Sequence, residues 1–296
     1  MTIAEVLDGS MEVSAPFVGP FVHGAFLAAA ERAVGRVPDD LMVFTDDHGA
    51  IALVRVDEEI RFAGEDWITD YHAPLGDDPM PCLIDAFTSS SGLRYRFDSL
   101  PPEAADVVRA ALDAVGASVD EDIHESTAVY TKSDEGWLSD IGKKQRHEVK
   151  RKRRRLEDEL GAASLVEAGA EDISRFCDVH RSNSPDKEAF MTDAMERFFA
   201  ELIETAGARI HNLEAGGRVV ASAFGFPCDD AYYLYNSAYD MDVAALSPGA
   251  VLLGYLIEHE LDRGVTTFDF LKGDEVYKRR HGGVPRPLHR LTGVLP

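Results

Sequence analysis

The hydrophobic pattern divides the first part of the chain into alternating strands and helices. Runs of apolar and β-branched residues bounded by turn residues predict strands at 41–45, 50–56, 93–100 and 117–130. Apolar residues at helical spacing predict helices at 21–34, 79–89 and 102–115. Pro102 suits the first turn of the last helix. The pattern is typical of an α/β fold.

The second part follows the same alternation after a long helix at 135–160, which Gly161 ends. Start signals at Ser184-Pro185 and at Thr192 predict further helical segments. Three strands are predicted next, at 208–215, 219–228 and 231–240. The remaining predicted elements are a helix at 249–263, a strand at 265–271, a short basic helix and a strand near 288–294.

The length of 296 residues and a hydrophobic content of 45% favour two domains of ordinary size. We place the boundary between 1–132 and 133–296. The segments 43–54 and 211–224 both read as hairpins preceded by a helix, which suggests a duplicated α/β plan. We therefore expect mixed, mostly antiparallel sheets flanked by helices.

Composition excludes several classes of protein. No run of eighteen apolar residues occurs, and the N-terminal stretch already carries acids, so we expect a cytoplasmic protein without membrane insertion. The three cysteines form no CxxC pair, which argues against disulfides and a zinc site. No HExxH or similar spacing appears among the ten histidines, and the sequence predicts no metal.

The charge is distributed unevenly. The net charge is −23, yet nine of the thirteen residues in 143–155 are Lys or Arg and only Glu148 is acidic, which leaves −31 on the rest of the chain. An acidic body with one basic helix repels polyanions in general and attracts an anionic group to one place. Nucleic-acid binding in general is therefore disfavoured.

The most informative segment is 247–282, where Ser247 and Pro248 lead into an apolar helix. The first amides of a helix have no partner within it, so small residues at this point allow a phosphate to approach. We predict that a phosphate-bearing acyl donor binds at Ser247, Pro248, Gly249 and Ala250, with Tyr239 at the end of the preceding strand.

With these segments, the chain resembles the GNAT superfamily of N-acyltransferases. The resemblance is to its CelD/BioF2-like branch and to the Fem-type peptidoglycan aminoacyl transferases of bacteria. It is carried by the basic helix at 143–161, the LSPGAVLL segment and the FDFLKGDEVYKRRHG segment. The resemblance implies two tandem GNAT-like domains. The second would bind the donor and carry out catalysis, and the first, a degenerate GNAT-like domain, would lie on the acceptor side.

The same resemblance implies roles for individual residues. Lys278 lies in Tyr-Lys-Arg-Arg-His-Gly, which is similar to the Fem element whose lysine stabilises an oxyanion, and Tyr277 beside it is a further catalytic candidate. Arg146 corresponds to the arginine that binds acceptor phosphates, and Lys150 lies one turn further along the predicted helix.

Other candidates follow from position in the predicted elements. Asp269 alternates with two phenylalanines, so its side chain would face the donor cleft. There it could act as a base or pair with an arginine, and Asp274 is an alternative base. Asp70 and Tyr71 could line the acceptor groove or form a polar turn.

The resulting prediction is an acyltransferase in which an amine attacks the donor carbonyl directly. Acetyl-CoA or another acyl-CoA is the favoured donor, and a small-molecule or cell-envelope amine, in either case possibly anionic, is the acceptor. Of the usual GNAT pyrophosphate loop only Gly249 agrees, so two alternatives stay open. These are a Fem-type transferase that uses aminoacyl-tRNA and a non-catalytic GNAT-fold protein that binds an anionic metabolite.

Overall fold

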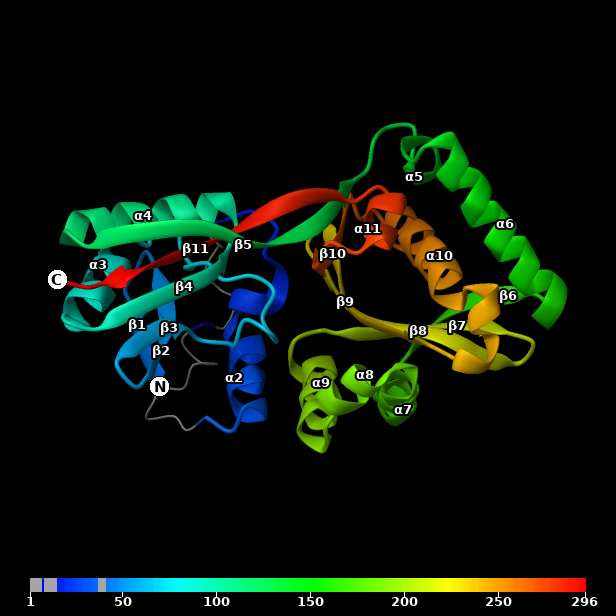
Figure 1. Ribbon diagram of the computed structural model, residues 1–296, viewed down its shortest axis with the longest axis horizontal. Helices are drawn as coiled ribbons and strands as arrows, with labels where there is room; N and C mark the ends of the chain where they lie inside the picture. The colour runs from blue at the N-terminus through cyan, green and yellow to red at the C-terminus, as the bar shows by residue number, and fades with distance from the viewer. Residues whose placement is uncertain (1–6, 8–14, 37–40) are drawn as a thin grey trace. The chain divides into compact units, whose positions relative to one another are not determined.

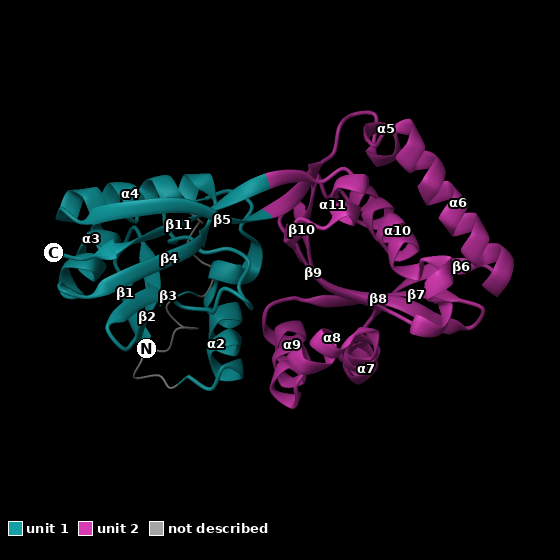
Figure 2. Cartoon of the chain, viewed as in Figure 1, with its two compact units in different colours: residues 1–126, 286–296 teal, residues 127–285 magenta. Residues whose placement is uncertain are grey.

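The computed structural model describes residue 7 and residues 15–36 and 41–296. The N-terminal stretch in which we expected no signal segment lies outside the described residues, apart from Leu7. The chain forms two compact units, 1–126 with 286–296 and 127–285 (Figure 2). This division differs from the predicted 1–132 and 133–296, because the final strand pairs with a strand of the first unit.

The first unit is a mixed sheet with helices. Its strands are β1 (Leu41–Thr45), β2 (Ala50–Val56), β3 (Glu59–Phe62), β4 (Arg94–Leu100), most of β5 (Ser118–Thr131) and most of β11 (Val284–Val294). Their order is β1-β2-β3-β4-β11-β5. β3 and β4 pair in parallel, while the pairs β1–β2, β2–β3 and β4–β11 are antiparallel. The helices are η1 (Gly19–Val22), α2 (Gly24–Ala33), α3 (Met80–Ser89) and α4 (Pro102–Val115).

The second unit contains five complete strands and the end of β5. The strands are β6 (Ala163–Ala168), β7 (Arg209–Ala215), β8 (Arg218–Cys228), β9 (Ala231–Tyr239) and β10 (Thr267–Lys272), in the order β5-β10-β9-β8-β7-β6. The helices before β7 are α5 (Trp137–Asp140), α6 (Lys143–Leu160), η3 (Ala170–Asp172), α7 (Ile173–Asn183), α8 (Pro185–Phe190) and α9 (Asp193–Thr205). Those after β9 are η4 (Met241–Leu246), α10 (Pro248–Asp262) and α11 (Val276–Arg280).

Helices cover both faces of the second unit's sheet (Figure 1). On one face, α10 buries an apolar side that includes Leu252, Leu256 and Ile257 against Phe268 of β10. On the other face lie α7, α8 and α9. Helices α7 and α9 pack aromatic side chains against β8 and β9, as in the 4.7 Å contact between the ring centroids of Phe199 and Phe224. No helix among the described residues is long and apolar enough to cross a lipid bilayer.

The helix predicted at 135–160 is divided into α5 and α6. Gly142 is extended and forms the N-cap of α6, while Ile141 before it is buried. A glycine inside a helix costs about 1 kcal/mol relative to alanine, so the break is inexpensive at this position. The break allows Trp137 and Ile141 to join the core of the second unit.

The two units share a connection pattern. In the first, β3 leads through α3 to β4, which lies parallel to it; in the second, β9 leads through α10 to β10, also parallel. All other pairings described within each unit are antiparallel. The predicted fold class, mixed and mostly antiparallel sheets flanked by helices, is confirmed, and the pattern agrees with the suggested duplication.

Candidate active site

Strands β9 and β10 pair over a short distance and then separate. The parallel pairing joins Ala231–Tyr233 to Thr267–Asp269, whereas β9 continues to Tyr239. A register shift opposite Phe224 and Gly225 places one extra residue, Tyr235, in β9. Such a bulge bends the strand and increases its twist. The strand edge beyond Tyr233 is therefore not covered by β10.

Two side chains cover this edge instead. Because Asp240 N–H donates to Val220 of β8, the N–H and C=O of Tyr239 point away from β8. Asn183 at the end of α7 binds both groups, accepting from Tyr239 N–H at 3.3 Å and donating to its C=O at 2.6 Å. Lys187 of α8 donates to Ser237 C=O at 2.9 Å. The C=O of Ser237 and both backbone groups of Tyr239 are therefore already paired within the protein.

The sequence did not single out this polar group on α7 and α8. Burial lowers the pKa of the Lys187 ammonium, and burial together with the Lys187 charge lowers the pKa of His180 to about 4. The only local signal was the density of polar residues around Ser184-Pro185, where a helix was expected to begin. Ser184 does cap α8, accepting from Lys187 N–H.

The N-terminus of α10 lies directly after the end of β9. Ser247 adopts a left-handed conformation with φ 56°, and its C=O accepts from the N–H groups of Ala250 and Val251. Its hydroxyl makes no capping bond, and Pro248 has no N–H. The N–H of Gly249 has no partner in the described part of the chain. One backbone donor is therefore available at this helix end.

Tyr239 and Gly249, predicted as donor-binding residues, lie in contact. A Cβ atom at position 249 would be 3.3 Å from Cδ1 of Tyr239, so the ring packs against the bare face of the glycine. A larger residue at position 249 would have to displace the ring. The glycine therefore keeps the first turn of α10 close to the end of β9.

A pocket opens beside the first turn of α10. Its lining residues come from α6, α10 and the end of α11: Gln145, Glu148, Val149, Lys152, Ala250, Arg280 and His281. The imidazole of His281 is stacked on Trp137, and its buried Nε2 has no hydrogen-bond partner among the described residues. Lys152 and Arg280 make the pocket suitable for an anionic group.

Lys278 holds the turn that follows β10. It is buried, and its ammonium donates to the carbonyl oxygens of Leu271 at 3.0 Å, Lys272 and Gly273 at 3.3 Å. The carboxylate of Glu275 lies 3.0 Å away but is half exposed. These contacts satisfy the three N–H donors of the ammonium. The predicted oxyanion role would require one of these hydrogen bonds to be released.

The other predicted catalytic residues surround the same turn. Asp269 is buried and accepts from Leu271 N–H at 2.7 Å, which supports the left-handed conformation of Leu271, φ 59°. Asp274 is exposed, and its C=O accepts from Arg279. Burial raises the pKa of the half-buried Tyr277 above its ordinary value, which keeps the phenol neutral. Asp269 and Lys278 thus act together on the geometry of the turn.

The predicted phosphate-binding residues of α6 face outward. Lys150 is exposed and Arg146 is half-buried, and neither makes a hydrogen bond or ion pair with a described residue. Arg153, by contrast, binds Glu258 at 2.8 Å and stacks on Tyr255, which ties α6 to α10. The charges at 146 and 150 are therefore available to an anionic ligand.

The predicted acceptor residues of the first unit lie in a packed region. Tyr71 is fully buried, and the guanidinium carbon of Arg286 lies 5.5 Å from its ring centroid. Asp70 is half-buried and has an interaction partner. The surroundings of Tyr71 are those of a core residue, and its predicted role in acceptor binding stays a prediction.

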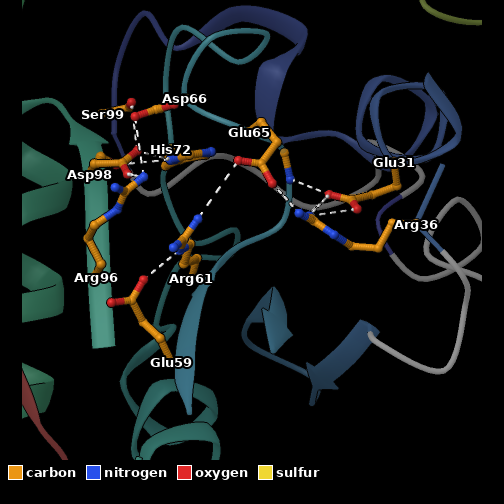
Figure 3. Close-up of polar contacts among 11 residues, drawn as sticks. Glu31, Arg36, Glu59, Arg61, Glu65, Asp66, His72, Arg96, Asp98 and Ser99 are labelled. Atoms are coloured by element: carbon orange, nitrogen blue, oxygen red, sulfur yellow. Dashed lines mark hydrogen bonds and ion pairs between the residues drawn. The ribbon is translucent and has the colours of Figure 1, made fainter. Parts of the chain in front are cut away.

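A polar network with His72 and Asp98 at its buried end follows directly after Tyr71 (Figure 3). His72 Nδ1 lies 3.3 Å from Asp98 of β4, and Arg96 bridges Asp98 and Asp66 at 3.2 and 3.3 Å. Although burial acts in the opposite direction, the hydrogen bond from His72 and the charges of His72 and Arg96 hold the pKa of Asp98 well below its usual range. The network attaches the segment around His72 to β4.

Comparison with known proteins supports the interpretation of the second unit. A family model described as an acetyltransferase (GNAT) domain matches residues 143–279. FemX has a similar structure over 100% of this chain and 96% of its own, with a TM-score of 0.67 and 10% identity. L-PGS from Bacillus licheniformis matches over 95% of this chain and 92% of its own, with a TM-score of 0.60 and 15% identity.

A protein of unknown function from Bacteroides thetaiotaomicron is also similar, with a TM-score of 0.67 and 13% identity over 99% of this chain and 95% of its own. No curated protein matches the chain by sequence. At these identities the solved structures establish the fold of the whole chain, and the family match identifies the domain. That domain runs from α6 to α11 and includes both the separated strands and the N-terminus of α10. Residues 143–279 therefore form a GNAT domain, which supports an acyltransferase.

Proposed function

We propose that the protein transfers an acyl group from acyl-CoA, with acetyl-CoA as the simplest donor, to the amine of a small-molecule or cell-envelope acceptor. The observation that carries the proposal is the separation of β9 from β10 directly before the N-terminus of α10. The free N–H of Gly249 and the cations Lys152 and Arg280 beside it suit a diphosphate.

The reaction would be a direct acyl transfer. The amine nitrogen forms a bond to the thioester carbonyl carbon, the carbon–sulfur bond breaks, and the thiolate leaves. The nitrogen loses one proton and the thiolate takes one up, so the products are an amide and a free thiol. The protein contributes by holding the two reactants in position and by presenting dipoles to the developing oxyanion. An acyl-CoA donor would place the reaction in the cytoplasm, as the composition predicts.

Lys278 and Asp269 enter this proposal as positioning residues. Both bind the backbone of the turn at 271–273, which follows the strand on one side of the separation. Arg146 and Lys150 are the proposed contacts for an acceptor that carries phosphate or carboxylate groups. Assignment to the CelD/BioF2-like branch stays a prediction from the resemblance.

Release of the free thiol from acetyl-CoA in the presence of a panel of amines tests the proposal. The panel contains amino sugars, polyamines and amino acids, and Gly249→Val is compared with the wild type. We expect amine-dependent thiol release that Gly249→Val reduces through a higher KM for the donor. Binding of acyl-CoA without turnover, seen as thermal stabilisation alone, would favour the non-catalytic ligand-binding alternative.

A second candidate function is aminoacyl transfer from aminoacyl-tRNA. This function is favoured because Asn183 and Lys187 bind the backbone edge of β9. These backbone groups are then not available to the pantetheine arm of coenzyme A. The outward cations of α6 suit an RNA backbone locally, while the net charge of −23 opposes extended contact with RNA. Transfer of a radiolabelled amino acid from tRNA, with no thiol release from any acyl-CoA, would select this alternative.

A further inference from the structure

Three buried polar atoms converge near the C-terminal end of α10, far along the helix from the donor site. They are Nε2 of His211, Nε2 of His259 and Oε1 of Glu260, and none has a hydrogen-bond partner in the described part of the chain. His211 is 0% and Glu260 1% exposed. Buried polar atoms are nearly always paired, because leaving one without a partner is costly. Their convergence indicates a missing ligand.

The geometry brings a fourth group to the same place. Glu167 of β6 is the direct cross-strand partner of His211 of β7. Ligand atoms from Glu167, His211 and His259 all lie within 4.8 Å of one another. His211 Nε2 is 3.4 Å from Oε1 of Glu260 and 4.0 Å from Oε2 of Glu167. Two strands and one helix thus direct two imidazoles and the Glu167 carboxylate toward a common point, and Glu260 lies beside His211.

The second nitrogen of His211 is held in place. Nδ1 lies 3.3 Å from the hydroxyl oxygen of Tyr232, which is itself fully buried. When Nδ1 carries the proton and donates it to this oxygen, the lone pair of Nε2 faces the cluster. Metal-binding histidines are commonly oriented by such a hydrogen bond from the other ring nitrogen.

A cation beside the cluster is compatible with this arrangement. Nη1 of Arg209 lies 3.2 Å from Oε2 of Glu167. A carboxylate has two oxygens and accepts several partners, so Glu167 can bind a metal through one oxygen and Arg209 through the other. Arg209 would then hold the exposed carboxylate in position.

We propose that Glu167, His211 and His259 bind one Zn²⁺ ion. Imidazole nitrogens with a carboxylate oxygen suit zinc. Three protein ligands leave the fourth tetrahedral position to a water molecule or to Glu260, whose Oε1 lies 3.4 Å from His211 Nε2. The ion would join β6 and β7 to the last turns of α10. The sequence predicted no metal site, because the ligands come from three segments separated by tens of residues.

The test uses the full chain without a histidine tag, treated with chelator and then titrated with ZnCl₂. We expect one Zn²⁺ per chain by elemental analysis, and a visible absorption band of tetrahedral Co²⁺ when cobalt replaces zinc. With free zinc at 100 times its Kd, the unfolding temperature should rise by about 5–10 °C.

Variants at the two more exposed ligands keep the test independent of folding. His259→Gln and Glu167→Gln should weaken zinc binding at least about tenfold. His147→Gln changes an exposed histidine of α6 and should bind zinc like the wild type. The proposal would be overturned if the wild type bound no stoichiometric zinc, or if all variants bound zinc equally. The contact between His211 and Glu260 would then be a buried hydrogen bond.

Discussion

Replacing Lys278 by methionine separates a structural from a catalytic role. Methionine keeps most of the length of the side chain and removes the ammonium that binds three backbone carbonyls. Lys278 is 2% exposed, so water does not readily replace the lost ammonium as a donor to these carbonyls. Hydrogen bonds to a charged group contribute about 1.5–3 kcal/mol each, but the three share one ammonium and the freed turn can relax.

We therefore expect Lys278→Met to lower the free energy of unfolding by about 3 kcal/mol, on the order of two such bonds after relaxation. The ion pair with the half-exposed Glu275 adds little, because solvent screens it. In a unit of this size the change corresponds to about 6–12 °C in unfolding temperature. Lys144→Met, at an exposed lysine of α6, should change it by less than about 2 °C.

The assay combines thermal unfolding with steady-state kinetics of thiol release below the unfolding transition. Loss of stability with a comparatively small change in kcat supports the positioning role. A variant as stable as the wild type whose kcat falls by about 100-fold would refute this reasoning and restore the oxyanion role predicted from the sequence.

Three further predictions follow from the second unit. The pKa of His180 is lowered to about 4 in the folded state, so the protein loses stability as pH falls from about 6.5 to about 4. His180→Gln should remove up to about 3 kcal/mol of this loss, measured by denaturant titration at the two pH values. A pH profile identical to that of the wild type would contradict this prediction. Asn183→Ala should speed hydrogen exchange of the Tyr239 amide roughly tenfold, measured by NMR; protection equal to the wild type would show that Asn183 does not hold this edge. Gly249→Val should raise the KM for acyl-CoA roughly tenfold with little change in kcat, and a KM equal to that of the wild type would place the donor elsewhere.

Local sequence signals were sufficient for most elements of the fold. β1, β2 and α4 begin and end where the pattern predicts, because alternation, Pro102 and the Asp46–Gly49 turn act over few residues. The exposed edge strand β6 was missed, since it has no continuous buried face. Helix α7 was also missed, because its β-branched residues, Cys177 and His180 are weak helix formers that tertiary packing stabilises.

The site was predictable only in part. The contact between Gly249 and Tyr239 joins two elements that follow one another, so the sequence could place both residues near the donor. The closure of the β9 edge depends on Asn183, which lies 56 residues before Tyr239. No periodicity reports such a contact. The oxyanion role of Lys278 stays a prediction. Its backbone contacts could not be foreseen, since residue type predicts charge but not which acceptors the folded turn presents.

The central claim is that an acyl-CoA donor binds with its diphosphate at the first turn of α10. A crystal structure of the full chain soaked with coenzyme A tests it most directly. We predict a diphosphate oxygen about 3 Å from the Gly249 nitrogen, with Arg280 or Lys152 in contact with the same group. Crystals that show the coenzyme bound away from α10, or that bind none at concentrations saturating for related enzymes, would contradict the claim.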